Sequence, residues 1–261
     1  RDRATQGLPP VELDDGAPTR AGQRHAEDMA ARGFLGHWGT DGSVPEQRYT
    51  EAGGQDFVTE NASCLFDEAT RGVDKNARID PADLEHAEGL FFNEVPPNDG
   101  HRRNILSPRH RTVGVGIAVP VAQPHEIVKP CIAQEFVDPY GSYHSLPASA
   151  KVGETVRVEG TVKGPATFAG VGVSRVDLPT PLPVREANRR RSYPVPAPYV
   201  TYWPPGYKTP IPVQVSGSRF QIDVPLSEAG RAGLYGVSVW AKVQGSDDLV
   251  MVSLRTLAVR K

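Results

Sequence analysis

The sequence predicts two domains of different class, an α+β domain over residues 1–144 and an all-β sandwich over residues 145–261. Helical and strand patterns are mixed in the first part, whereas the second part shows short alternating strands separated by turns. The 26 glycines and 25 prolines suit a chain with many turns. A length of 261 residues fits one large domain or two ordinary ones, and the change of pattern favours two.

The first predicted helix covers residues 18–33, "PTRAGQRHAEDMAARG". Its apolar residues recur at helical spacing, which favours one buried face, and Gly33 is a suitable stop. The apolar positions are Ala21, Ala26, Met29 and Ala30.

Two further helices are expected to start at caps. Ser43 and Glu46 form the Ser-x-x-Glu pattern of a capping box, and the segment ends in two glycines. Farther on, Asp80 is placed as an N-cap, with Pro81 at the first helical position and acidic residues in the first turn.

Strands are expected at 112–119 and 131–137 in the first domain, where β-branched or alternating residues dominate. In the second domain no helix is expected, and Tyr235 lies where the tyrosine corner of an immunoglobulin-like sandwich is found. We therefore expect an immunoglobulin-like or fibronectin-like sandwich. Its predicted strands are 154–162, 218–226, 234–243 and 249–259.

A proline-rich insert at residues 179–212 interrupts these strands and carries an arginine run, 189–191. One interpretation is an extended surface loop stiffened by proline. The other is an aromatic and basic patch for a sugar, a peptide or the first domain. The candidate ligand patch consists of Tyr199, Tyr202 and Trp203.

Charge is divided unevenly along the chain. Residues 1–145 hold 14 Lys and Arg against 23 Asp and Glu, a net −9, and residues 146–261 hold 15 against 8, a net +7. The two halves either dock electrostatically, face an anionic surface, or are each solvated independently. The sequence contains no run of 18 apolar residues, so we expect no membrane span, and we expect no nucleic-acid partner.

The two cysteines, Cys64 and Cys131, do not by themselves predict a bridge. In an exported protein they would pair, whereas in the cytosol they would be two small buried thiols.

Four segments in the first domain offer a histidine or a carboxylate: "LGHWGTDG" with His37, "VTENAS" with Glu60, "FFNE" with Glu94, and "DGHRRNIL" with His101. Taken singly, each residue has a structural explanation. His37 follows a helix stop, Glu60 lies in a strand-like run, Glu94 ends a helix, and His101 lies in a loop.

Taken together, the segments resemble the CAP superfamily of cysteine-rich secretory proteins, antigen five and plant pathogenesis-related proteins. The resemblance covers most of residues 1–140 and rests on the order and spacing of five motifs. Phe91 stands where the family usually has Trp, and the histidine loop has the form common in bacterial members. The motifs are the opening "GLPPVELDDGAPTRAGQRHAEDMAARGFLGHWGTDG", then "TEN", "FFNE", "DGHRRNILSPRHRTVGVGIAV" and "CIAQEFVDPYGSY".

The resemblance implies an α-β-α sandwich whose cleft holds His37, Glu60, Glu94 and His101 as a tetrad. Two imidazoles with carboxylates nearby suit Zn²⁺ or another divalent cation, with the acids as direct ligands or as partners of the ring nitrogens. The family resemblance also implies export, and in an exported protein we expect Cys64 and Cys131 to form a disulfide. Because such domains open with a helix, "RDRATQG" would be the last turn of a truncated first helix.

We therefore expect a secreted or cell-envelope protein that binds a divalent metal and a small ligand or surface, with a lipid, a glycan or a protein as partner. Interdomain docking is a further expectation. The alternative is a metal-dependent or tetrad-based, protease-like hydrolase, although no serine or cysteine lies in an activated motif. Sterol binding is disfavoured because the loop at residues 64–83 has only Phe66 as an aromatic residue.

Overall fold

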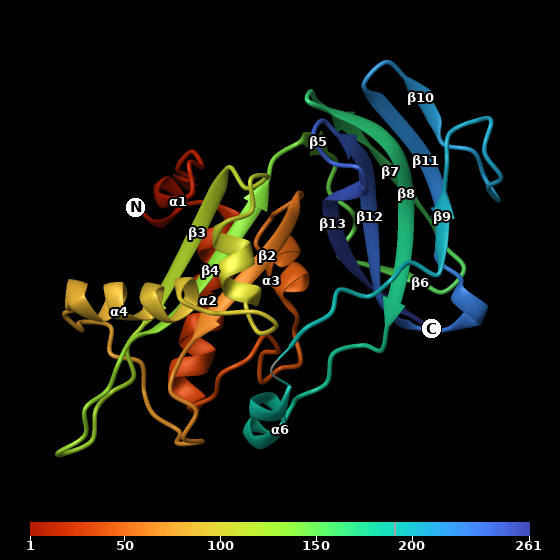
Figure 1. The fold of residues 1–261 in the computed structure, drawn as a ribbon. Coiled ribbons are helices and arrows are strands. Elements are labelled where there is room, and N and C mark those ends of the chain that lie inside the picture. The colour runs from red at the N-terminus through yellow and green to blue at the C-terminus, as the bar shows by residue number, and fades with distance from the viewer. Residues whose placement is uncertain (191) are drawn as a thin grey trace. The chain divides into compact units, whose positions relative to one another are not determined.

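The computed structural model describes residues 1–190 and 192–261, so residue 191 of the arginine run lies outside the described part. The chain forms two compact units, whose elements are labelled in Figure 1. Part of the predicted insert belongs to the first unit. That unit comprises Arg1–Ala52, Thr59–Val137 and Thr180–Tyr193, and the second comprises Gly53–Val58, Asp138–Pro179 and Pro194–Lys261.

The first unit is built on a four-stranded sheet in the order β1-β3-β4-β2. β1 pairs in parallel with β3, and β3 pairs antiparallel with β4. β2 is an edge strand. The strands are β1 (Glu12–Leu13), β2 (Phe57–Ser63), β3 (Thr112–Ala118) and β4 (Cys131–Asp138).

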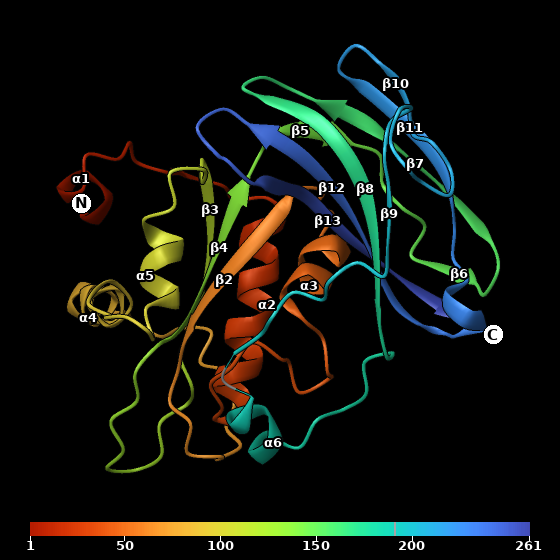
Figure 2. The same cartoon turned by 45° about the vertical axis from the view of Figure 1, so that its right-hand side comes forward.

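Helices cover both faces of this sheet, as Figure 2 shows. α2 (Ala17–Arg32) and α3 (Pro45–Glu51) lie on one face, and α4 (Pro81–Phe92) and α5 (Gly100–Ile105) on the other. A short α1 (Asp2–Thr5) opens the chain. The first unit is therefore an α+β structure, as predicted.

The glycines of β3 explain how α2 reaches the sheet. A Cβ atom at Gly114 would lie 2.3 Å from the carbonyl carbon of Pro18, and one at Gly116 would lie 2.1 Å from that of Gly22. Both distances are below van der Waals contact, so only glycine permits this approach of helix to strand. The alternate β3 side chains point to the opposite face.

Two of the three predicted caps are present. Gly33 ends α2 in the left-handed conformation (φ 62°), and the Asp80 side chain accepts a hydrogen bond from the Ala82 N–H. The predicted capping box is wrong, because α3 starts after Val44 and has no side-chain cap. Glu46 is buried and accepts a hydrogen bond from the Tyr193 hydroxyl instead.

The second unit is all-β, as predicted, and consists of two sheets that share one apolar core. The first sheet has the order β10-β11-β7-β5, and the second has the order β6-β13-β12-β8-β9. The strands are β5 (Gly141–Tyr143), β6 (Ser149–Lys151), β7 (Thr155–Val162), β8 (Ala166–Val176), β9 (Val200–Tyr202), β10 (Gln214–Ser216), β11 (Arg219–Pro225), β12 (Gly233–Val243) and β13 (Leu249–Arg260).

Tyr235 closes the loop that precedes β12. Its ring is fully buried, its hydroxyl donates to the Arg231 carbonyl over 2.8 Å, and the Glu228 N–H donates to the same hydroxyl over 3.1 Å. Glu228 begins a short 3-10 helix, Glu228–Gly230. The tyrosine therefore makes the backbone hydrogen bond expected of a tyrosine corner.

The expectation of no helix after residue 145 is wrong. The segment Val184–Arg189 forms α6, which follows Pro183 and belongs to the first unit. Ala187 is 1% exposed in a core cluster with Met29 and Phe34. Packing against that core stabilises a helix too short to be stable by itself.

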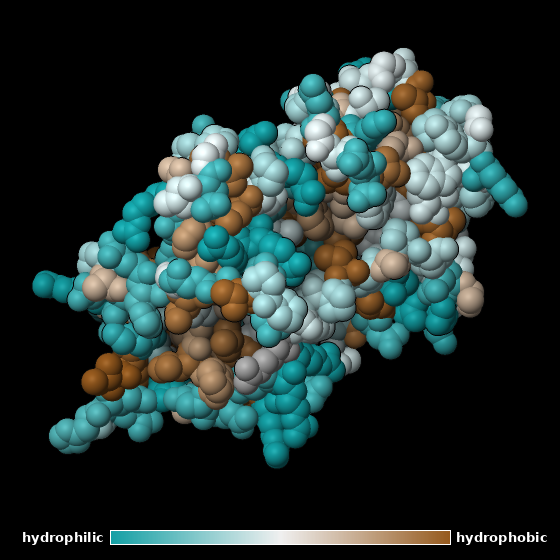
Figure 3. Space-filling view, in the orientation of Figure 1, coloured by the Kyte–Doolittle hydropathy of each residue, from teal (hydrophilic) through white to brown (hydrophobic). Residues whose placement is uncertain are grey.

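On the face drawn in Figure 3, apolar residues lie among hydrophilic ones. Among the described residues, no helix has the length and apolar character needed to cross a membrane.

Cys64 and Cys131 form a disulfide, as the family resemblance predicted. Cys64 follows β2 and Cys131 begins the neighbouring β4, so the bridge ties two strands of the first unit across 67 residues of sequence. Closing a loop of that size reduces the entropy of the unfolded chain.

Replacing both cysteines (Cys64→Ala, Cys131→Ala) is expected to lower the free energy of unfolding of the first unit by up to about 4 kcal/mol in the chain-entropy model. Hydrogen exchange in denaturant, followed by mass spectrometry, measures this loss on β3 and β4 peptides. Peptides from β12 and β13 are the internal control. Equal losses in both sets of peptides, or no loss in either, would contradict the assignment.

Candidate functional site

The structure brings the four predicted tetrad residues together as two hydrogen-bonded pairs. His37 Nδ1 lies 2.9 Å from Glu60 Oε1, and His101 Nδ1 lies 2.6 Å from Glu94 Oε1. The two imidazole rings lie side by side, with their centroids 6.3 Å apart and their planes tilted by 53°. The site therefore lies beside the edge strand β2, and each carboxylate is turned toward its own histidine.

Each side chain comes from a different element. His37 lies in the loop between α2 and α3, and Glu60 lies in the middle of β2. Glu94 follows the end of α4, while His101 lies in the first turn of α5. The loop between α4 and α5 turns back on itself, so that the Glu94 carboxylate also accepts the His101 backbone N–H over 2.9 Å.

Glu60 is the most connected residue of the site. Its Oε2 accepts a hydrogen bond from Arg48 Nη2 over 2.7 Å, and its Oε1 accepts from His37. Arg48 also donates to the His37 carbonyl oxygen over 3.1 Å. The side chains of Glu60 and Arg48 are each only 1% exposed. One buried ion pair thus holds both the ring and the backbone of His37.

The protonation of Glu60 follows from these contacts. Burial by itself raises the pKa of this carboxyl, but Arg48, His25 and His37 outweigh burial and hold the pKa well below its usual range. Glu60 is therefore ionised and balances the Arg48 guanidinium.

Two other acids in the same buried region behave differently. Burial, followed by the charge of Glu60, raises the pKa of Glu135 well above its usual range. Burial also raises the pKa of Glu46, although its hydrogen bond from Tyr193 opposes the rise. Arg48 therefore favours the ionised form of Glu60, and the charge of Glu60 in turn favours the protonated form of Glu135.

His25 is a buried neutral imidazole beneath the tetrad. Its Nε2 lies 2.7 Å from the Gly36 carbonyl oxygen and 3.7 Å from Glu60, and its side chain is fully buried. Burial, reinforced by the positive charge of Arg48, lowers its pKa to about 4. Nε2 therefore donates to Gly36 and supports the loop that carries His37.

His101 is held on the other side of the site. The centroid of its ring lies 4.8 Å from that of Phe91. Burial lowers the pKa of His101, and the negative charge of Glu94 opposes that shift. The side chains of His37 and His101 remain 15% and 28% exposed, so both rings can be reached from solvent.

The donor set of this site is two imidazoles with oriented rings. Because the carboxylates lie against Nδ1 of each ring, the Nε2 atoms are the ligands available to a metal ion. Among residues 1–190 and 192–261, no group of three or more His, Cys, Asp or Glu side chains is arranged to hold a metal. The protein atoms left for an ion here are therefore two imidazole nitrogens, fewer than the four ligands that Zn²⁺ usually takes.

A group of amides joins the two halves of the site, and sequence reasoning did not identify it. Asn61 Nδ2 donates to the His101 carbonyl oxygen over 3.2 Å, and Asn104 Nδ2 donates to Asn61 Oδ1 over 2.9 Å. Asn104 also lies 3.3 Å from the Glu60 carbonyl oxygen. Neighbouring residues in a strand point to opposite faces, so the side chains of Glu60 and Asn61 in "TEN" make contacts on opposite sides of β2. This alternation was the sequence signal that could have identified Asn61.

The three residues of the predicted ligand patch differ in how far they are buried. Tyr202 is 3% exposed and belongs to the core of the second unit. The ring of Tyr199 packs edge-on against that of Tyr235. The ring centroid of Trp203 lies 6.4 Å from that of Tyr207, a residue that is 69% exposed. Tyr202 thus serves packing, and only its neighbours reach the surface.

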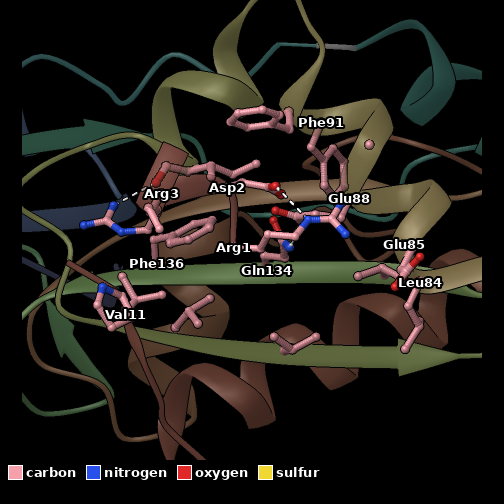
Figure 4. Close-up of a pocket in the computed structure, with 18 of the residues that line it drawn as sticks. Arg1, Asp2, Arg3, Val11, Leu84, Glu85, Glu88, Phe91, Gln134 and Phe136 are labelled. Atoms are coloured by element: carbon pink, nitrogen blue, oxygen red, sulfur yellow. Dashed lines mark hydrogen bonds and ion pairs between the residues drawn. The ribbon is translucent and has the colours of Figure 1, made fainter. Parts of the chain in front are cut away.

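A separate cavity of 1020 Å³ lies in the first unit (Figure 4). Residues of α1, α4, β3 and β4 line it, and most of these side chains are apolar, among them Phe91 and Phe136. Its polar residues include Glu88, which accepts a hydrogen bond from Gln134 over 2.6 Å. Phe91 contacts both the cavity and the His101 ring, so the cavity adjoins one side of the tetrad.

Comparison with known proteins relates the first part of the chain to a protein family. Residues 1–120 match the sequence model of CAP, the cysteine-rich secretory protein family. No curated protein matches the chain. Among solved structures, a chitin binding domain from Burkholderia pseudomallei aligns at 11% identity with a TM-score of 0.26, over 42% of this chain and 55% of that one. This chain thus covers about half of that domain, and a TM-score so low does not establish a shared fold.

The buried His25 predicts an acid-sensitive fold. Its pKa is about 4 in the folded protein and 6.5 when unfolded, so below pH 6.5 the unfolded chain binds a proton that the folded chain does not. The free energy of unfolding should fall between pH 6.5 and pH 4 by up to about 3 kcal/mol from this residue.

Glu46 and Glu135 act in the opposite direction, since their raised pKa values stabilise the folded state at low pH and the contribution is lost as pH rises. The difference between wild type and His25→Gln therefore isolates the histidine. Denaturant unfolding across this pH range should show wild type losing stability relative to the variant. Parallel pH profiles would contradict the assignment.

Proposed function

Because residues 1–120 form a CAP domain, we propose that the protein is an extracellular binding module that takes a divalent cation between His37 and His101. The observation that carries the proposal is the pair of neighbouring imidazoles, 6.3 Å apart at their centroids, each with Nδ1 against a carboxylate. Carboxylates in that position fix the tautomer of a metal-binding histidine and make the ring a stronger ligand.

Zn²⁺ suits this donor set, since imidazole nitrogen is one of its preferred ligands. His37 and His101 would hold the ion, and Glu60 and Glu94 would orient the rings. A bound ion would supply a Lewis-acid centre to which an oxygen of a ligand can bind. Only two protein ligands contribute, so the affinity should be lower than that of a four-ligand structural site.

The neighbouring cavity supports a small-ligand role for the same unit. Its volume of 1020 Å³ is that of a site for a molecule of moderate size, and its lining is mainly apolar but includes charged residues of α1 and α4. We assign it to a small apolar ligand such as a lipid.

An extracellular location agrees with the disulfide, since such bridges persist in oxidising compartments. CAP proteins are typically secreted, which points the same way.

We assign the second unit to the immunoglobulin-like sandwiches. In one sheet, β5, β7, β11 and β10 are neighbours in the same order as immunoglobulin strands A, B, E and D. In the other sheet, β8, β12 and β13 are neighbours in the same order as strands C, F and G. The corner hydrogen bond of Tyr235 supports the same assignment. Such a unit is suited to binding a surface or another protein.

The alternative function is a hydrolase, in which His37 with Glu60 would act as a general base. Ser43, the serine nearest to His37 in sequence, is 2% exposed and lies against Arg48, which suits a structural role. The binding function therefore has the stronger support. Hydrolysis of ester or peptide substrates that chelator and Glu60→Ala both abolish would favour the alternative.

Calorimetric titration of Zn²⁺ tests the proposed site. Wild type should bind one ion per chain, and the double variant His37→Ala/His101→Ala should give no specific heat of binding. His86→Ala removes an exposed histidine of α4 and should titrate like wild type. Equal heats for wild type and the double variant would contradict the assignment.

The role of the carboxylates is tested by Glu94→Gln. This change retains an oxygen acceptor for the His101 ring but removes the charge, and a loss of 10- to 100-fold in Zn²⁺ affinity is expected. An unchanged affinity would show that Glu94 does not support the ligand.

A further inference from the structure

One segment of the proline-rich insert crosses the loop that carries His37. We call it the strap, residues 180–193, of which 191 lies outside the described residues. The strap contains α6 and belongs to the first unit, although the chain before and after it belongs to the second. It is thus a distant part of the sequence added to the CAP unit.

The strap forms hydrogen bonds with the loop on both sides of His37. The Leu35 N–H donates to Asn188 Oδ1 over 2.9 Å, and the Leu182 N–H donates to the Thr40 carbonyl oxygen over 2.8 Å. His37 lies between these two anchors. A loop fixed at both ends and bonded to Arg48 beneath has little freedom to move its ring.

The loop is shaped to receive the strap. A Cβ atom at Gly36 would lie 3.1 Å from the Ala187 carbonyl oxygen, and one at Gly42 would lie 2.4 Å from that of Thr180. Gly42 also has a φ of +84°, a conformation that other residues rarely adopt. The backbones of loop and strap therefore lie in close contact at two places.

Aromatic and polar side chains complete the contact at the end of the strap. The Tyr193 ring packs edge-on against Trp38, the residue after His37, with 5.0 Å between centroids, and the Arg190 guanidinium lies 5.5 Å from the Trp38 ring. The Tyr193 hydroxyl donates to Glu46, two residues before Arg48 on α3. The strap thus touches both the loop and the helix that supplies the partner of Glu60.

From these contacts we infer that the strap positions His37 for ligand binding and that Asn188 and Tyr193 are its positioning residues. The inference rests on the proposed role of the His37–His101 pair. The strap contacts bear on one member of that pair, since the anchors flank His37 while His101 is held by Glu94 and by Asn61. Residues from the second half of the sequence therefore complete a site whose four tetrad residues all come from the first half.

The test compares Asn188→Ala/Tyr193→Phe with Arg185→Ala, an exposed residue of the same helix. Both variants leave the buried Ala187 in place. Loss of the Asn188 acceptor should speed amide exchange of Leu35 about tenfold, the factor for one hydrogen bond. In ¹H–¹⁵N spectra of the double variant, the ring signals of His37 should broaden or shift, whereas those of His101 should stay as in wild type. In the Arg185→Ala variant, the ring signals of both histidines should stay as in wild type.

Asn188→Asp provides a conservative rescue, since it keeps an oxygen at the same position, and it should retain the slow exchange of Leu35. Unchanged Leu35 exchange in the double variant would overturn the inference. So would equal changes in His37 and His101, because they would indicate general destabilisation. Zn²⁺ affinity of the double variant should fall about tenfold. If wild type binds no Zn²⁺, the metal proposal fails alone, and the exchange of Leu35 still decides the role of the strap.

Discussion

The site depends on one buried ion pair, between the Glu60 carboxylate and the Arg48 guanidinium. Removing two charges from water is expensive, so such a pair persists only where further hydrogen bonds satisfy it. Here His37 supplies one to the carboxylate, and the His37 carbonyl accepts one from Arg48. The pair therefore links a strand, a helix and a loop, and the position of the His37 ring follows from it.

The surrounding residues favour the burial of that ion pair. The raised pKa of Glu135 and the lowered pKa of His25 both favour a neutral group, so neither adds a charge beside the ion pair. The glycines of β3 let α2 lie close to the sheet, and α2 supplies His25. The strap covers the loop from outside, while the disulfide joins the strands on which Glu60 and Glu135 lie. Each of these features restricts where His37 can be.

Local patterns predicted much of this structure. The period of α2, the caps at Gly33 and Asp80, and the alternation of the strands are each encoded in a few neighbouring residues, and the structure has them. The tetrad could be predicted only from the order of the motifs that contain it, because each of its residues alone had a structural explanation. Arg48, Asn61 and Glu135 were missed because their roles depend on burial beside Glu60. α6 was missed for a similar reason, since its stability comes from distant core residues rather than from its own sequence.

We expect Glu60 to be the ionised member of the buried Glu60–Glu135 pair and Glu135 to be its protonated member. Carboxyl ¹³C NMR of the two side chains near neutral pH measures this directly, with Glu60→Gln and Glu135→Gln used to assign the signals. We expect the signal of an ionised carboxylate for Glu60 and that of a protonated carboxyl for Glu135. Two ionised carboxylates, or a protonated Glu60 beside an ionised Glu135, would contradict it.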